Sequence, residues 1–197
     1  MDKFVTIKNN NKRTGTITEI KKQTAMNIPS STITQSVSNI INVFTDGSCI
    51  QSSKGNKQNR PAGYACVFPE YPAYNYAAKL QGAEKTNNRA EYTACIAAFK
   101  IADKIDAKRD KVLYVYTDSE LLINSLTKWL NGWKTKNWKK ADGSAVKNVD
   151  LLKILDELMK TRIVVFKHVR AHTGKKDYQS INNDIADRLA KQAAHSK

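Results

Sequence analysis

The chain has 197 residues and a formal net charge of +15, from 33 lysines and arginines against 18 aspartates and glutamates. That length allows one sizeable core and a short appendage. The positive excess favours nucleic acid or another anionic surface as the partner, the alternative being a basic protein whose lysines only solvate its surface. No apolar run approaches the ~18 residues that a membrane span needs, so we expect no membrane association.

Cysteine usage and the N-terminus bear on location. The three cysteines, Cys49, Cys66 and Cys95, are odd in number and lack CxxC spacing, which argues against a disulfide framework or a zinc ribbon. The N-terminus has no apolar signal-peptide stretch, and Asp2 and Glu19 interrupt a transit-peptide pattern. We therefore expect an intracellular protein of the cytoplasm or nucleus, with an organelle as an alternative.

Residues 1–39 differ in composition from the rest of the chain. They are rich in Asn, Lys, Thr and Ser, carry six basic and two acidic residues, and have one aromatic, Phe4. Too little apolar surface is present for a separate core. We predict a polar, basic extension or linker, either disordered or containing a short hairpin of FVTIK with TGTITEI, ahead of a globular domain over residues 40–197.

Within that domain, alternating patterns give the elements in chain order. Three β-rich runs come first, at 41–46, 63–68 and 74–80. A helix over 90–105, a strand at 112–118, and helices at 120–130 and 149–159 come next. A fifth strand at 162–169 precedes a last helix with Ile181, Ile185 and Leu189 on one face. This order predicts an α/β fold: a five-stranded mixed sheet, antiparallel at the front, with helices on both faces.

Four carboxylates lie at the ends of predicted strands or on predicted helices. Asp46 and Asp118 end strands, Glu91 lies in the first turn of a helix, and Asp187 lies on the last helix, one turn after Asn183. The ends of neighbouring strands in an α/β sheet converge on one crevice. Carboxylates gathered there would repel one another, and hard divalent cations such as Mg²⁺ or Mn²⁺ would offset that repulsion. Taken singly, each acid could equally be a turn former or a helix N-terminal charge.

The flanking motifs carry a resemblance. TDGSC, TNNRAE, YTDSE and a final HxG…NDxxD block resemble the type 1 cellular class of the ribonuclease H family, from residue 41 to about 194. The resemblance implies the ribonuclease H-like fold and a monomer that hydrolyses the RNA strand of RNA/DNA hybrids with two Mg²⁺ ions, or Mn²⁺ in their place. It implies 5′-phosphate and 3′-hydroxyl products. It assigns the metal ions to Asp46, Glu91, Asp118 and Asp187.

The resemblance also implies further site residues. His172, in the loop before the last helix, would move a proton near the leaving oxygen or help product release, as an imidazole can near neutral pH. His168 and His172 also have HxxxH spacing, so a transition-metal site is an alternative, although no third soft ligand is evident. Contacts to the minor groove or to a DNA phosphate fall on Gly47, Ser48, Cys49, Thr86, Asn87, Asn88, Asn148 and Asn183. For Asn87 and Asn88 the alternative is helix capping.

A lysine- and tryptophan-rich stretch, residues 128–147, is the predicted basic handle. Its lysines would release counterions from phosphates, and its tryptophans could stack on sugars or bases. The residues we assign to the substrate here are Trp133, Lys136, Trp138, Lys139 and Lys140. Helical i,i+4 tryptophans usually bury, so packing at the base of the handle is the alternative for Trp129 and Trp133. In the family such a handle grips the DNA strand.

Some positions depart from the family pattern. Glu84 stands where relatives often carry arginine near the phosphate pocket, with Lys85 as possible compensation, and Glu120 replaces a usual glutamine. The loop 50–60 is longer than in compact relatives, and residues 1–39 lack the tryptophan and tyrosine positions of a hybrid-binding domain. Two other hypotheses stay open: a catalytically silent hybrid-binding module, and a junction resolvase or integrase core, the latter on fold analogy alone.

Overall fold

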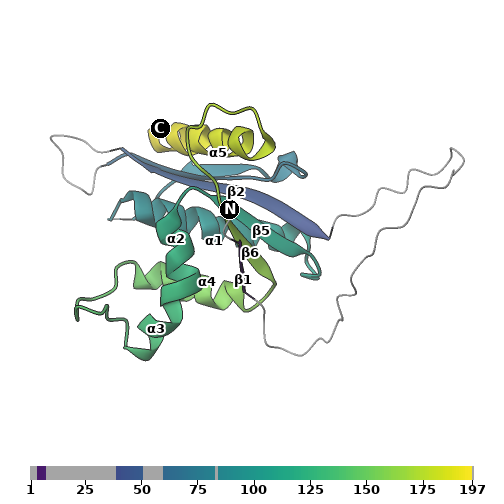
Figure 1. The fold of residues 1–197 in the computed structure, drawn as a ribbon. Helices are drawn as coiled ribbons and strands as arrows, with labels where there is room; N and C mark the ends of the chain where they lie inside the picture. Colours follow the sequence, from purple (N-terminus) through teal and green to yellow (C-terminus); the bar gives the residue numbers. More distant parts are fainter. Residues whose placement is uncertain (1–3, 8–38, 51–59, 83, 197) are drawn as a thin grey trace, which may run out of the picture.

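The protein forms a six-stranded mixed sheet with helices on both faces (Figure 1). The structure, a computed structural model, describes residues 4–7, 39–50, 60–82 and 84–196. The strands are β1 (Phe4–Ile7), β2 (Ile40–Cys49), β3 (Ala62–Val67), β4 (Tyr76–Lys79), β5 (Val112–Thr117) and β6 (Val164–His168). Their order across the sheet is β1-β6-β5-β2-β3-β4.

The sheet has the predicted antiparallel front and parallel addition. β2 pairs antiparallel with β3, and β3 antiparallel with β4. β2 runs parallel to β5, and β5 parallel to β6. All five predicted strands are present, and the predicted α/β architecture with a mixed sheet is confirmed.

The sixth strand, β1, was not predicted as part of this sheet. It pairs antiparallel with β6, with Phe4 opposite Lys167 and Ile7 opposite Val164. The sequence offered a hairpin with TGTITEI instead, and that segment lies outside the described residues. β1 finds a partner in β6 because β6 would otherwise leave its backbone groups unpaired at the edge of the sheet.

The helices lie on the two faces of the sheet. α5 (Tyr178–His195) covers β2, β3 and β4 on one face, and α1 (Asn87–Ile105) with α4 (Val149–Met159) covers the other (Figure 1). A short 3₁₀ helix (η2, Pro72–Tyr74) joins β3 to β4. No helix in the described ranges is long and apolar enough to cross a bilayer.

The predicted helix over 120–130 is interrupted. It begins as α2 (Glu120–Asn124), widens into a π-helical segment (η3, Ser125–Trp129) and tightens again into α3 (Leu130–Thr135). An extra residue per turn shifts the faces of the helix beyond the widened segment. A periodicity argument based on 3.6 residues per turn could not foresee this widening.

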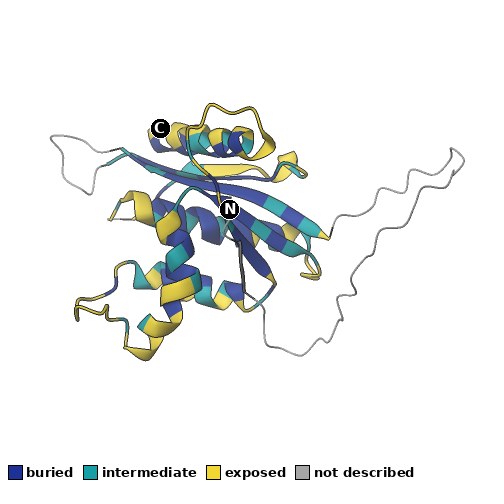
Figure 2. Cartoon of the chain, viewed as in Figure 1, coloured by how far each residue is buried: buried dark blue, intermediate teal, exposed yellow. Residues whose placement is uncertain are grey.

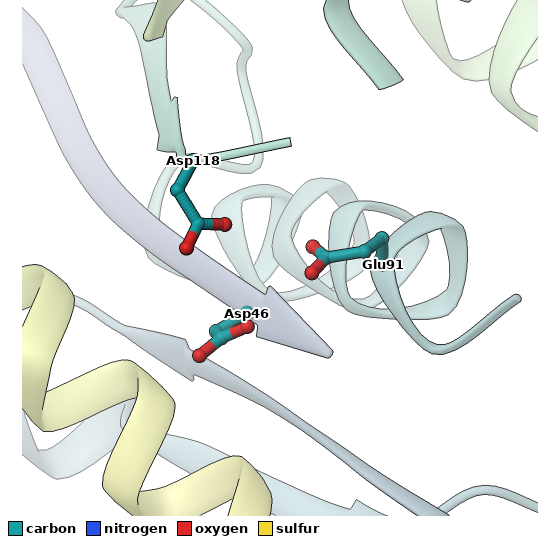
Figure 3. A group of neighbouring side chains, drawn as sticks. All are labelled: Asp46, Glu91 and Asp118. Atoms are coloured by element: carbon teal, nitrogen blue, oxygen red, sulfur yellow. The ribbon is translucent and has the colours of Figure 1, made fainter. Parts of the chain in front are cut away.

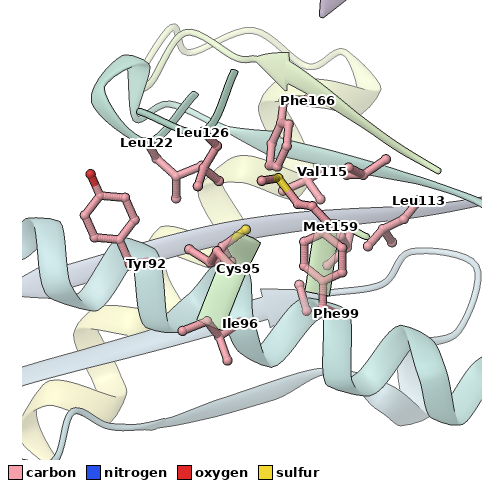
Figure 4. Close-up of a cluster of buried hydrophobic side chains, with 14 of the residues drawn as sticks. Tyr92, Cys95, Ile96, Phe99, Leu113, Val115, Leu122, Leu126, Met159 and Phe166 are labelled. Atoms are coloured by element: carbon pink, nitrogen blue, oxygen red, sulfur yellow. The ribbon is translucent and has the colours of Figure 1, made fainter. Parts of the chain in front are cut away.

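Buried residues lie on both sides of the sheet (Figure 2), and Figure 4 shows part of the main cluster. Alternate residues of β2 take opposite sides, so Ile41 and Val43 join the main cluster with α1 and α4. Phe44 faces α5 and stacks on Tyr116, with ring centroids 4.5 Å apart. The sheet is therefore fixed on both faces beneath the ends of β2 and β5.

A buried ion network holds the far end of α1, away from those strand ends. The Arg162 side chain is fully buried, and its Nη2 donates to Asp106 Oδ2 at 3.0 Å. Its Nε lies 3.7 Å from Asp103 Oδ1. Asp103 also forms a two-point pair with Arg109, at 3.1 and 2.8 Å. The network ties α1 to the turn between α4 and β6.

Candidate active site

Three acidic side chains meet where β5 ends alongside β2 (Figure 3). β2 continues past Asp46 to Cys49, so Asp46 lies inside the strand rather than at its end as predicted. Parallel pairing with β5 stops at Phe44 opposite Tyr116, which brings Asp46 level with Asp118, the residue directly after β5. Ligand oxygens of Asp46, Glu91 and Asp118 all lie within 4.8 Å of one another.

Gly47 allows α1 to approach β2 closely enough to bring Glu91 into this group. A Cβ at residue 47 would lie 2.5 Å from the Ala90 carbonyl carbon and closer still to the Glu91 nitrogen. Any side chain would push the strand and the helix apart. The glycine of the TDGSC motif therefore places Asp46 beside Glu91.

Asp187 reaches the same site from α5. That helix lies tightly on β3, because a Cβ at Gly63 would lie 2.5 Å from the Ala190 oxygen and the Ala194 nitrogen. Asp187 lies close enough to the group for its charge to raise the pKa values of both Asp46 and Asp118. Asp187 does not join the three-carboxylate group itself; instead its Oδ2 accepts from Lys191 Nζ at 2.7 Å.

Burial and mutual repulsion make these acids hard to ionise. Burial first, and then the charges of Asp118 and Asp187, raise the pKa of Asp46 to about 7. Burial, together with the charges of Asp46 and Asp118, also raises the pKa of Glu91 well above its ordinary value. The pKa of Asp118 is raised mainly by burial, while the nearby His168 and His172 act in the opposite direction. Carboxyls with raised pKa values gathered in one crevice mark a functional site more often than a structural one.

The donor set fits a divalent metal. Glu91 is 8% exposed, and its Oε2 has no hydrogen-bond partner in the described part of the chain. A buried carboxylate oxygen without a partner is costly unless something positive binds it. Oxygen-only ligands are the set that Mg²⁺ and Mn²⁺ prefer. The group of possible ligands found among the described residues contains carboxylates alone.

The two histidines beside the acids differ in their contacts. His168 ends β6, and its Nε2 lies 3.2 Å from the Asp118 carbonyl oxygen. His172 is exposed in the β6–α5 loop, in a left-handed conformation with φ 51°, and its charge reaches Asp118. His172 therefore lies in the loop between β6 and α5, as the sequence predicted.

The predicted minor-groove residues lie on three elements: the last residues of β2, the first turn of α1, and α5. The Cys49 main-chain N–H donates to Asn87 Oδ1 at 2.6 Å, which joins the end of β2 to the start of α1. Asn87 and Asn88 are exposed on the first turn of that helix. Asn183 is buried on α5, and its Oδ1 has no hydrogen-bond partner within the described ranges. Gly47 and Ser48 complete this edge of β2.

The predicted phosphate contacts are linked by a residue that the sequence did not single out. Thr86 caps α1 by accepting from the Arg89 main-chain N–H at 3.2 Å. The Arg89 side chain donates to Asn148 Oδ1 at 3.2 Å and pairs with both oxygens of Asp150. Asn148 lies 59 residues from Arg89. No local sequence signal marks so distant a contact.

The basic handle is a folded protrusion. Trp133 and Trp138 pack against the main core, whereas Trp129 is 40% exposed. The predicted packing role therefore holds for Trp133 and not for Trp129. Lys134 is held by Asp156 at 2.7 Å. Three further lysines, which we call the handle lysines, point into solvent: Lys136, Lys139 and Lys140.

The comparisons with known proteins agree with this geometry. The family model described as RNase H matches residues 38–195. The chain belongs to the ribonuclease H family. The ribonuclease H of Maricaulis maris is 36% identical over 152 residues, covering 77% of this chain and 91% of that protein. Ribonuclease HI of Haemophilus ducreyi is 35% identical over 156 residues, covering 79% and 91%. The predicted family and the predicted enzyme class, a ribonuclease H hydrolase, are confirmed.

Solved structures share the fold. The RNase H domain of PFV has a TM-score of 0.64 and 26% identity, over 79% of this chain and 94% of that domain. A ribonuclease H from compost, solved in complex with RNA/DNA hybrid, has a TM-score of 0.53 and 23% identity, over 78% and 96%. The second likeness concerns the fold alone. Together they show the ribonuclease H fold over nearly the whole described domain.

Proposed function

We propose that this ribonuclease H hydrolyses the RNA strand of RNA/DNA hybrids, leaving 5′-phosphate and 3′-hydroxyl ends. The observation that carries the proposal is the group formed by Asp46, Glu91 and Asp118 within 4.8 Å, in a chain of this family. The compost relative, solved with RNA/DNA hybrid, supports the choice of substrate. An acidic group alone would be compatible with many phosphodiesterases, so family membership decides the class.

The metal ions of this proposal are two Mg²⁺, with Mn²⁺ able to replace them. Asp46, Glu91, Asp118 and Asp187 would hold them. The chemistry that two such cations supply is activation of water and stabilisation of the leaving oxygen of a phosphodiester. Binding would also remove the repulsion that raises the pKa values of Asp46 and Glu91.

The chain's own side chains would bind and orient the hybrid. The Asn87 and Asn88 amides, with the main chain around Cys49, would sense the RNA 2′-hydroxyls, which both donate and accept hydrogen bonds. His172, exposed beside Asp118, would hold or transfer a proton close to the leaving oxygen. The handle lysines would neutralise DNA phosphates.

The organisation that goes with this function is a catalytic domain over residues 40–197, with its handle over 128–147 and an N-terminal extension over 1–39. The family match over 38–195 supports that division. We propose that the protein acts as a monomer inside the cell. All three cysteines are free and buried, which suits a reducing compartment.

Cleavage of matched duplexes tests the proposal. RNA/DNA, RNA/RNA and DNA/DNA duplexes of one sequence are incubated with Mg²⁺, with and without EDTA, using the wild type and Asp118→Asn. Cleavage of the RNA strand in the hybrid alone, lost with EDTA and in the variant, is the expected result. Hybrid binding without cleavage by the wild type would favour the silent binding module. Cutting of branched DNA would favour a resolvase.

A further inference from the structure

One side chain, Arg89, joins the N-terminus of α1 to the N-terminus of α4. Its two terminal nitrogens pair with both carboxylate oxygens of Asp150, at 3.0 and 2.6 Å. Nη1 also donates to Asn148 Oδ1 at 3.2 Å. Such a two-point pair fixes the plane of the guanidinium, so Arg89 presents this donor to Asn148 in a fixed direction.

This contact sets the orientation of the Asn148 amide. A guanidinium only donates, so the oxygen of the amide must face Arg89 and the NH₂ group must point away from it. Asn148 occupies the N-cap position of α4 in a left-handed conformation, φ 58° and ψ 32°, and its side chain makes no cap hydrogen bond. An asparagine at an N-cap ordinarily uses its oxygen on the helix. Here the amide oxygen accepts from Arg89 instead, and the NH₂ group is free of the helix end.

The main-chain N–H of Arg89 holds a second side chain, Thr86. Thr86 Oγ1 accepts from the Arg89 main-chain N–H at 3.2 Å, and its hydroxyl hydrogen remains available to donate. Thr86 is exposed at the start of α1. The two side chains held by Arg89 therefore both offer hydrogen-bond donors. Phosphate oxygens, which only accept, match such a pair.

The charge of Arg89 is paired within the protein, which distinguishes Arg89 from a direct ligand of a phosphate. Hydrogen bonding to Asp150 raises the pKa of Arg89, and the charge of Glu84 acts in the same direction. With its charge already matched by Asp150, Arg89 is engaged inside the protein.

We propose that Arg89 is a positioning residue for substrate binding: its side chain orients the Asn148 amide beside the Thr86 hydroxyl, which its main-chain N–H holds, so that both donate to one phosphate of the DNA strand. The inference rests on the proposed function and names the part of the chain that sets one contact. Sequence carries no sign of it, because Arg89 and Asn148 meet only in the folded chain.

The test compares two arginines. Arg89→Met removes the side-chain donors to Asn148 and Asp150, keeps an unbranched apolar side chain, and leaves the main-chain N–H that holds Thr86. Arg109→Met is the matched control, because Arg109 also forms a two-point pair with an aspartate, Asp103, at the far end of α1. Hybrids carrying one uncharged methylphosphonate at successive positions of the DNA strand are bound to each full-length protein in EDTA. The dissociation constant is measured for every position.

The wild type is expected to bind more weakly when the methylphosphonate replaces one particular phosphate of the DNA strand. Arg89→Met should bind the unmodified hybrid about five- to tenfold more weakly, as for one hydrogen bond of ordinary net strength, and should lose most of the sensitivity at that linkage. Adding Asn148→Ala to Arg89→Met should cost less than Asn148→Ala costs alone, because the two share one contact. Arg109→Met should keep the wild-type pattern. If Arg89→Met fails to fold, Asp150→Asn, which loosens the guanidinium, should show the same loss in weaker form.

A variant profile that keeps the wild-type sensitivity at that linkage would overturn the inference, and so would full additivity with Asn148→Ala. A wild type that binds no hybrid at all would instead defeat the proposed function. KM should rise more than kcat falls in Arg89→Met, whereas a loss confined to kcat would also speak against positioning of a binding contact.

Discussion

Asp46→Asn should stabilise the metal-free protein at neutral and alkaline pH. Asp46 is 5% exposed and faces the charges of Asp118 and Asp187. An asparagine of the same shape removes one charge from the cluster, while its amide can still donate to Glu91 and Asp187. The substitution destroys the proposed metal site, so greater stability with loss of activity is the signature of a functional carboxylate.

The magnitude comes from the pKa of Asp46. A rise from 3.8 to about 7 corresponds to about 4 kcal/mol, at about 1.4 kcal/mol for each tenfold change in proton affinity. Because the folded state holds this proton more tightly than the unfolded state, the metal-free wild type loses stability as pH rises from about 4 to 7. Above that range the loss is complete. About 4 kcal/mol is an upper bound, since the carboxyls of Asp46 and Glu91 interact and their protonation is linked, and we expect a gain of about 2–4 kcal/mol at pH 8.

Urea unfolding in EDTA at pH 4, 6 and 8 measures the effect. The variant should be close to the wild type at pH 4 and more stable at pH 8, and added Mg²⁺ should stabilise the wild type more than the variant. Asp184→Asn, an exposed aspartate on α5, is the control and should change little at any pH. A variant less stable than the wild type at pH 8 would refute the electrostatic reasoning, as would a difference that does not depend on pH.

Three further predictions concern the handle, the histidine and the buried arginine. Replacing the three handle lysines by alanine should weaken hybrid binding and lower the slope of log affinity against log salt by up to about 3; an unchanged slope would remove the handle lysines from the interface. His172→Ala should lower kcat by about tenfold to hundredfold without abolishing single-turnover cleavage, and complete loss would give His172 a more direct role. Arg162→Met should cost about 3–5 kcal/mol in urea unfolding, because it leaves the nearly buried carboxylate of Asp106 without its charge partner. Wild-type stability in that variant would show that the network contributes nothing.

The acidic cluster could be predicted because its members obey local patterns. Asp118 comes directly after a β-rich run, Glu91 lies one turn inside a capped helix, and Asp46 precedes a glycine whose lack of a side chain brings strand and helix together. Each of these features can be recognised from a few neighbouring residues of the sequence. The sheet then assembles them, since β2 and β5 run parallel and in register.

Other features depend on contacts that no local pattern encodes. Arg89 and Asn148 meet across 59 residues, and Phe4 meets Lys167 at the edge of the sheet. The π-helical segment Ser125–Trp129 changes which faces of the handle are buried, so that Trp129 is exposed. Periodicity gives the existence of the helix there, whereas its pitch is decided by the elements it packs against.

The most direct test of the central claim is a crystal structure with Mn²⁺ and a hybrid whose RNA strand resists cleavage, with the metal located by anomalous scattering. The account predicts two manganese peaks among the carboxylates of Asp46, Glu91, Asp118 and Asp187, beside the RNA strand. Absence of manganese from this group in crystals that hold the bound hybrid would contradict it.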